Sequence, residues 1–105
     1  MRGVMRSVDV ALRLGESLLV GEWVAAEGGV VADETCQRIE RLVEAVLERI
    51  TADATGWDIL FRDPADGRFW ELYYPHSEMH GGGPPSLRHL TSEQVGAKYR
   101  VSGNL

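Results

Sequence analysis

Two segments with a period of two, separated by a short turn, constrain the fold of this chain most. In residues 57–62 and again in residues 69–74, successive side chains alternate between two faces. The connection between them reads DPADGR, in which Pro64 presets φ for a type I turn and Gly67 suits a left-handed position. Asp63 can bond back to the backbone of this turn. The pattern predicts a β-hairpin, and Pro75 predicts either the end of its second strand or an edge position.

The clearest helical pattern follows Asp33, which we interpret as an N-cap. From Glu34 to about Ala52, apolar residues recur at three- and four-residue spacing and predict one amphipathic helix. These apolar positions are Cys36, Ile39, Val43, Val46, Leu47 and Ile50. Their burial would contribute on the order of 10 kcal/mol before entropy is subtracted, so we expect the helix to lie across a sheet.

The remaining elements are expected to be short. Branched and aromatic residues predict a strand near 18–25 and a return strand near 30–32, joined by a turn at Glu27-Gly28-Gly29. Another strand is predicted over 86–90. Thr91 with Gln94 three residues later is typical of an N-terminal capping box and predicts a short last helix.

Together these elements predict an α+β fold. It would contain a small antiparallel sheet of about four to five strands, one long helix packed on it and a short C-terminal helix. A chain of 105 residues supports one core, so we expect a single domain over 17–105. Residues 1–16 predict only a poorly defined leader.

Charge and cysteine content indicate which kinds of binding partner and which cellular compartment to expect. Eleven Lys and Arg against sixteen Asp and Glu give a net charge of -5, which argues against nucleic acid or an anionic membrane and favours a basic partner. The lone Cys36 cannot form an internal disulfide, and no apolar run approaches the length of a membrane span. We therefore expect a cytoplasmic protein, with Cys36 as a core residue.

An enzymatic reading rests on the segment HSEMH. If it is extended, His76, Glu78 and His80 project to one side, where they could bind a metal for a small hydrolase. The flanking proline and glycine residues make an extended course uncertain and no fourth ligand is marked, so loop-supporting roles are favoured. Ser77 lacks the surroundings of a nucleophile elbow. We expect neither a catalytic residue nor a cofactor.

The glycine run at 81–83, followed by Pro84 and Pro85, indicates a tightly specified backbone. It resembles a phosphate-binding loop only superficially, because prolines follow where a helix should begin. A close crossing of two backbone segments is the favoured interpretation. The only basic residues interleaved with the neighbouring aromatic residues are Arg62 and Arg68, and the chain is acidic, so sheet packing is favoured over stacking on nucleic acid. An exposed group of them would indicate a protein interface.

The run DPADGRFWELYYPHSEMHGGGPPSL, residues 63–87, resembles the signature of the bacterial immunity protein 27 family. The earlier LVGEWV, Asp33 with its helix, and Gly56-Trp57 fit the family in the same order. The similarity covers about residues 17–100. It implies an α+β protein of a polymorphic toxin system, which binds a cognate toxin domain without catalysis and so protects the producing cell.

The resemblance marks the motif positions in the hairpin and loop as candidates for binding the partner or for supporting the binding loop. These candidates are Asp63, Asp66, Arg68, Trp70, Glu71, Tyr74, Ser77, Glu78, His80, Gly81, Gly82, Gly83, Pro84 and Pro85. Neither the toxin nor the oligomeric state follows from the sequence. The metal-dependent hydrolase is kept as the alternative.

Overall fold

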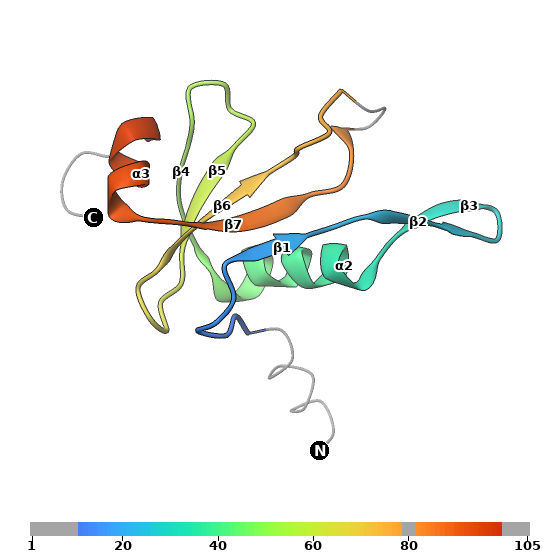
Figure 1. Cartoon of the computed structure of the whole chain (residues 1–105), viewed down its shortest axis with the longest axis horizontal. Helices are drawn as coiled ribbons and strands as arrows, with labels where there is room; N and C mark the ends of the chain where they lie inside the picture. The colour runs from blue at the N-terminus through green and yellow to red at the C-terminus, as the bar shows by residue number, and fades with distance from the viewer. Residues whose placement is uncertain (1–10, 79–81, 100–105) are drawn as a thin grey trace, which may run out of the picture.

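The structure, a computed structural model, describes residues 11–78 and 82–99 of the chain. It is an α+β fold built on a five-stranded antiparallel sheet with the strand order β1-β7-β6-β5-β4 (Figure 1). The strands of this sheet are β1 (Leu18–Val20), β4 (Glu48–Ala52), β5 (Ile59–Arg62), β6 (Phe69–Tyr73) and β7 (Ser86–Leu90). A separate two-stranded sheet is formed by β2 (Trp23–Ala26) and β3 (Gly29–Ala32). The predicted fold class is confirmed.

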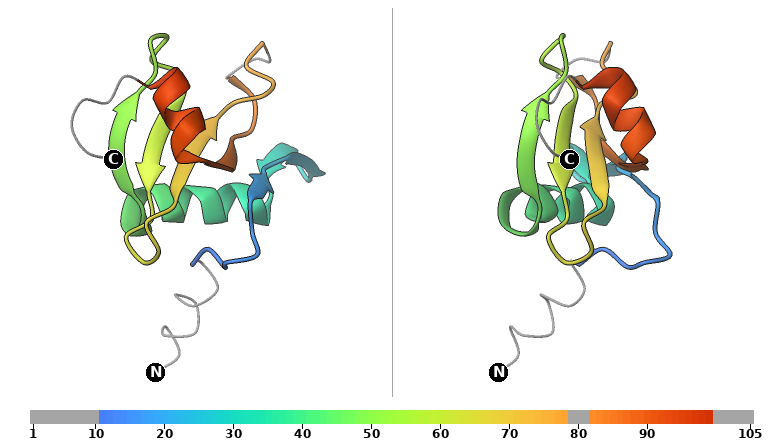
Figure 2. Two further views of the ribbon diagram at one scale, coloured as in Figure 1. Left: turned by 60° about the vertical axis from the view of Figure 1, so that its left-hand side comes forward. Right: turned by 90° about the vertical axis from the view of Figure 1, so that its left-hand side faces the viewer.

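Helices cover both faces of the five-stranded sheet (Figure 2). On one face lie α2 (Glu34–Arg41) and the π-helical turn η1 (Leu42–Val46), and on the other lies α3 (Ser92–Lys98). The core beneath α2 contains Leu19, Ile39, Leu42, Leu47, Phe61, Trp70, Leu72 and Leu87. The core beneath α3 contains Leu60, Phe69, Leu90, Val95 and Tyr99. Alternation along the strands therefore separates two cores, as a sheet covered on both sides requires.

The predicted hairpin is confirmed as β5 and β6. Its turn is closed by a hydrogen bond from the Asp63 amide to the Arg68 carbonyl, at 2.8 Å. The Asp63 carboxylate accepts the Ala65 amide at 2.9 Å, and Gly67 has φ +81°. Strand pairing sets Phe61 opposite Trp70, so the core face forms in register.

The predicted helix over 34–52 is right at its start and wrong at its end. The Asp33 carboxylate caps the helix by accepting the Cys36 amide at 2.8 Å. At the other end the Leu47 amide bonds to the Leu42 carbonyl, five residues back, and Leu47 itself is extended. This wider turn ends the helix, and residues 48–52 form the edge strand β4 instead. Ile50 consequently packs in the core beneath α3, away from the helix's apolar face.

The single strand predicted near 18–25 is also wrong, because it is two strands divided at Gly21. The Gly21 amide donates to the Pro85 carbonyl at 2.9 Å. A Cβ at this position would lie 2.6 Å from both the Pro85 carbonyl oxygen and the Cys36 sulfur. Beyond this crossing, β2 leaves the main sheet and pairs with β3 in a hairpin that extends away from the body (Figure 1).

The two ends of the described chain are fixed differently. The predicted capping box at the start of α3 is confirmed: Thr91 and Gln94 each accept the other's backbone amide. In the predicted leader, residues 1–10 lie outside the described residues, while Glu16 bonds to Arg38 at 2.7 Å. Among the described residues, no helix is long and apolar enough to cross a membrane.

Candidate functional site

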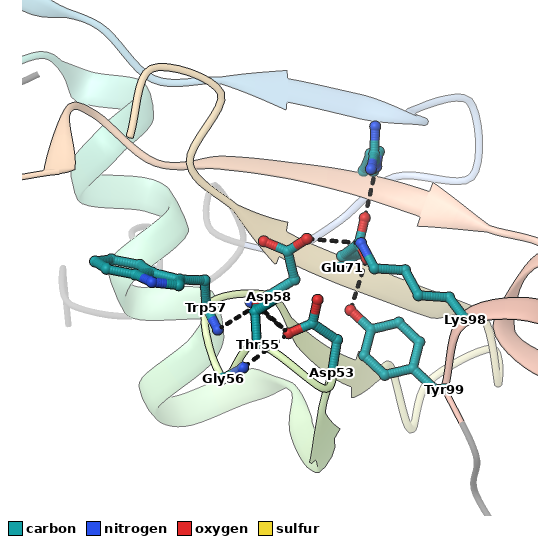
Figure 3. Close-up of polar contacts among 9 residues, drawn as sticks. Asp53, Thr55, Gly56, Trp57, Asp58, Glu71, Lys98 and Tyr99 are labelled. Atoms are coloured by element: carbon teal, nitrogen blue, oxygen red, sulfur yellow. Dashed lines mark hydrogen bonds and ion pairs between the residues drawn. The ribbon is translucent and has the colours of Figure 1, made fainter. Parts of the chain in front are cut away.

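A buried carboxylate lies at the centre of the predicted site. Glu71, on the middle strand β6, is fully buried and points toward α3 (Figure 3). One of its oxygens accepts Arg88 Nε at 2.7 Å, and the other accepts the Tyr99 hydroxyl at 2.6 Å. Lys98 Nζ lies 2.7 Å from Glu71 and 2.6 Å from Asp58. This group, the Glu71 network, joins β6, β7, α3 and the loop that precedes β5.

The partners of Glu71 determine its charge. Burial alone would raise its pKa, but hydrogen bonds from Lys98, Tyr99 and Arg88 outweigh burial and hold the pKa below its usual value. Burial and the bond to the carboxylate raise the pKa of Tyr99. The carboxylate is therefore ionised and fully engaged, an arrangement that suits a structural role.

The loop beside this network is braced by Asp53. Its carboxylate accepts the Thr55 hydroxyl at 2.7 Å and the Gly56 amide at 3.0 Å (Figure 3). The loop presents Trp57, whose side chain is 59% exposed. Trp57 meets Tyr74 edge to face, with ring centroids 6.3 Å apart. This pair is the partly exposed aromatic group that the sequence suggested.

Arg68, at the end of the hairpin turn, fastens the N-terminal segment to the sheet. It donates to the Glu16 carbonyl at 2.9 Å and to the Arg13 carbonyl at 3.0 Å. Asp66 orients the guanidinium through a 2.8 Å bond to Nε, and the same group lies 4.9 Å from the centre of the buried Trp70 ring. Arg68, Asp66 and Trp70 therefore make contacts within the fold, and those of Arg68 join the hairpin turn to the N-terminal segment.

The glycine-proline segment crosses another part of the backbone, as predicted. Gly83 is buried with φ +75°, and a Cβ there would lie 2.6 Å from the His76 carbonyl oxygen. Gly82 has φ +91° and lies near Trp57. Pro84 is buried, and Pro85 accepts the Gly21 amide. The candidates His80 and Gly81 lie outside the described residues.

The turn after β6 contains the only solvent-facing candidates in the described part of the predicted loop. Ser77 and Glu78 are exposed there. His76 Nδ1 lies 3.8 Å from a Glu78 oxygen, and both side chains are more than half exposed. No group of three potential metal ligands is found within residues 11–78 and 82–99. Nothing in this geometry supports the hydrolase alternative.

A surface that the sequence did not single out lies on the α2 side. A pocket of about 250 Å³ opens between α2, the base of the β2–β3 hairpin and the glycine-proline segment. It is lined by Trp23, Ala32, Cys36, Ile39, Glu40, Val43, Leu72, Tyr74, Gly83 and Pro85. Only Tyr74, Gly83 and Pro85 were candidates. The available signal was Trp23, a large aromatic residue next to Glu22 in the predicted strand near 18–25.

Cys36 lines this pocket as a core residue rather than a nucleophile. Its side chain is 1% exposed, and its sulfur lies 3.5 Å from the Glu22 carbonyl oxygen. Burial, together with the neighbouring Asp33 carboxylate, raises the pKa of the thiol. A thiol held in its neutral form is a poor nucleophile, which agrees with the expected core role.

Comparison with known proteins gives one match. The sequence model of the family described as Immunity protein 27 matches residues 25–91, which is 67 of the 105 residues. The matched range runs from the β2–β3 hairpin to the start of α3 and includes every candidate residue. Neither curated proteins nor solved structures gave a match.

Proposed function

The chain belongs to the immunity protein 27 family, and from this premise we propose that it binds and neutralises a cognate bacterial toxin domain in the cytoplasm of the producing cell. The observation that carries the proposal is the family match over residues 25–91. Neutralisation would proceed by stoichiometric binding, without catalysis and without a cofactor.

The architecture agrees with an inhibitor that binds as a rigid body. The Glu71 network and the Arg68 contacts fix the hairpin, the last helix and the N-terminal segment relative to one another. A preorganised surface loses little conformational entropy on binding, which favours tight complexes. The net charge of -5 would also speed capture of a basic toxin.

The candidate residues then divide into two roles. We assign support of the surface to the residues that are buried, internally bonded or held at positive φ: Asp63, Asp66, Arg68, Trp70, Glu71, Gly82, Gly83, Pro84 and Pro85. We assign contact with the partner to Tyr74, Ser77 and Glu78, which face solvent or the pocket. Under this division, Glu78→Ala weakens protection without lowering the free energy of unfolding, whereas Trp70→Ala lowers it because a fully buried ring is lost.

The test is co-expression with the toxin encoded by the neighbouring gene. Cells that carry both proteins should grow, and cells that carry the toxin alone should not. In vitro, toxin activity should fall in proportion to added immunity protein and vanish at about one equivalent, as a tight inhibitor requires. Active toxin recovered after denaturing separation and refolding would show that binding, not modification, caused the loss.

Two outcomes would reject the proposal. If both proteins are expressed and folded but the cells do not grow, this chain is not the immunity protein of that toxin. Inactivation of many toxin molecules by one molecule of this chain would show an enzyme instead. The metal-dependent alternative then predicts that a chelator abolishes inactivation.

A further inference from the structure

The β2–β3 hairpin exposes an unusual number of apolar side chains. Val24, Val30 and Val31 are 41%, 63% and 50% exposed, and Trp23 is 36% exposed. The hairpin extends beyond α2 and the five-stranded sheet, so within the described chain no element covers its outer part (Figures 1 and 2). Contiguous apolar surface of this kind marks sites of interaction with other proteins.

Strand pairing separates the two faces of this hairpin. Trp23 pairs with Ala32 and Ala25 pairs with Val30, while Val24 pairs with Val31. Residues directly opposite in an antiparallel pair share a face, and neighbours along a strand alternate. One face therefore carries Trp23, Ala25, Val30 and Ala32, and the other carries Val24 and Val31.

The first of these faces leads into the pocket. Trp23 and Ala32 belong to both, and Tyr74 and Pro85 also line the pocket. The pocket and this face of the hairpin form one surface, which we call the arm–pocket surface. A volume of about 250 Å³ would accommodate a large side chain from a partner.

The charge of the segment that carries this surface favours a partner with a basic surface. Residues 17–37 contain Glu22, Glu27, Asp33 and Glu34 but no Lys, Arg or His, so this segment carries a charge of -4 out of the chain's -5. Glu40 adds a carboxylate at the pocket. Exposed apolar side chains on a segment of this negative charge are complementary to a basic protein surface.

We propose that the arm–pocket surface is the docking site for the toxin domain, which presents a basic surface and inserts an apolar side chain into the pocket. This inference rests on the proposed function and adds to it the place of contact. It differs from the exposed turn at Ser77 and Glu78, which would lie at the margin of the interface. A second copy of this chain is the competing occupant, but the negative charge of its own residues 17–37 would repel it.

Two valine-to-lysine variants test which face of the β2–β3 hairpin binds the toxin domain. Val30→Lys places a cation on the arm–pocket face, and Val31→Lys places one on the opposite face of the same strand. Both valines are exposed, and both variants change the net charge equally, so long-range steering is matched. Binding to the purified toxin domain of the neighbouring gene is measured by calorimetry, and folding is checked by thermal unfolding.

We expect Val30→Lys to raise Kd by about tenfold or more, and Val31→Lys to raise it by less than about threefold. Trp23→Ala should also weaken binding, because it removes one wall of the pocket. Equal effects of the two lysines, or a larger effect at Val31, would overturn the assignment while the proposed function stands. A wild-type dimer that Val30→Lys dissociates would assign the surface to self-association and likewise overturn it. No binding by the wild type would reject the proposed function, and this inference with it.

Discussion

The carboxylate of Glu71 accepts a 2.6 Å hydrogen bond from the Tyr99 hydroxyl, and this contact ties the middle strand of the sheet to the end of the last helix. Replacing Glu71 by Ala would leave Arg88, Lys98 and Tyr99 without their shared acceptor. We expect Glu71→Ala to lower the free energy of unfolding by about 2–4 kcal/mol, because the buried Tyr99 hydroxyl loses its acceptor while the partly exposed Arg88 and Lys98 become hydrated. Tyr99→Phe removes one bond only and should cost about 1 kcal/mol.

Urea denaturation of both variants provides the measurement. If Glu71→Ala were no less stable than Tyr99→Phe, the carboxylate would not be the organising group of this network. If Glu71→Ala does not fold, Glu71→Gln provides the comparison, since it keeps an acceptor oxygen and loses the charge.

Acid should weaken the attachment of the N-terminal segment through Glu16. The hydrogen bond from Arg38 lowers the pKa of Glu16 from 4.5 to about 2. The ionised form therefore stabilises the fold: its contribution is complete above about pH 4.5 and is lost as pH falls toward 2. We expect Glu16→Gln to cost about 2 kcal/mol at pH 7 and almost nothing near pH 2. A stability difference that stays constant over this pH range would contradict the assignment.

The parts of this fold that could be predicted from the sequence are those fixed by short-range chemistry. The hairpin turn at 63–68 and the caps at Asp33 and Thr91 depend on bonds between residues at most five apart. Such bonds leave a local pattern that can be recognised without knowing the rest of the fold.

The two errors concern boundaries that distant residues decide. Residues 48–52 continue a helical spacing, yet their pairing with β5 turns them into a strand. Likewise, the division at Gly21 depends on Cys36 and Pro85, which lie far along the chain. The arm–pocket surface escaped prediction for the same reason, because its walls come from four separate segments that only the fold brings together.

Arg68 should be more important for stability than an arginine in an ordinary surface ion pair. Its bonds to the carbonyls of Arg13 and Glu16 fix the N-terminal segment to the hairpin turn, and the bond between Arg38 and Glu16 fixes the same segment to α2. Arg68→Ala should cost about 1–3 kcal/mol and should speed tryptic cleavage after Arg13. Arg62→Ala is the matched control, because its pair with Glu48 is exposed and should contribute less than about 1 kcal/mol. Equal effects of the two variants would show that Arg68 is only a surface charge.

The glycine-proline segment offers a test that separates backbone strain from steric contact. Gly82 and Gly83 both have positive φ, so an alanine at either should cost about 1–2 kcal/mol. Only at Gly83 would the new Cβ also meet a backbone atom, 2.6 Å away at His76. We therefore expect Gly83→Ala to cost at least about 1 kcal/mol more than Gly82→Ala in thermal or urea unfolding. Equal costs would indicate that the crossing relaxes freely.

Gly21 and Gly96 should respond to alanine in opposite directions. At Gly21 a Cβ would lie 2.6 Å from the Cys36 sulfur and from the Pro85 carbonyl oxygen, so β1 or the glycine-proline segment would have to move. We expect a loss of about 1–3 kcal/mol. Gly96 lies within α3 with nothing within 4 Å, and alanine there should add about 0.5–1 kcal/mol through helix propensity.

The Gly21→Ala and Gly96→Ala variants also test whether the β2–β3 hairpin contributes to toxin binding. Because Gly21 lies where the chain leaves β1 for the β2–β3 hairpin, Gly21→Ala should shift this hairpin relative to the pocket and weaken toxin binding. Gly96→Ala, on the opposite side of the sheet, should leave binding unchanged while raising the unfolding temperature. A Gly21→Ala variant that is destabilised but binds as tightly as the wild type would show that the close contact of Gly21 with Pro85 does not set the position of the β2–β3 hairpin.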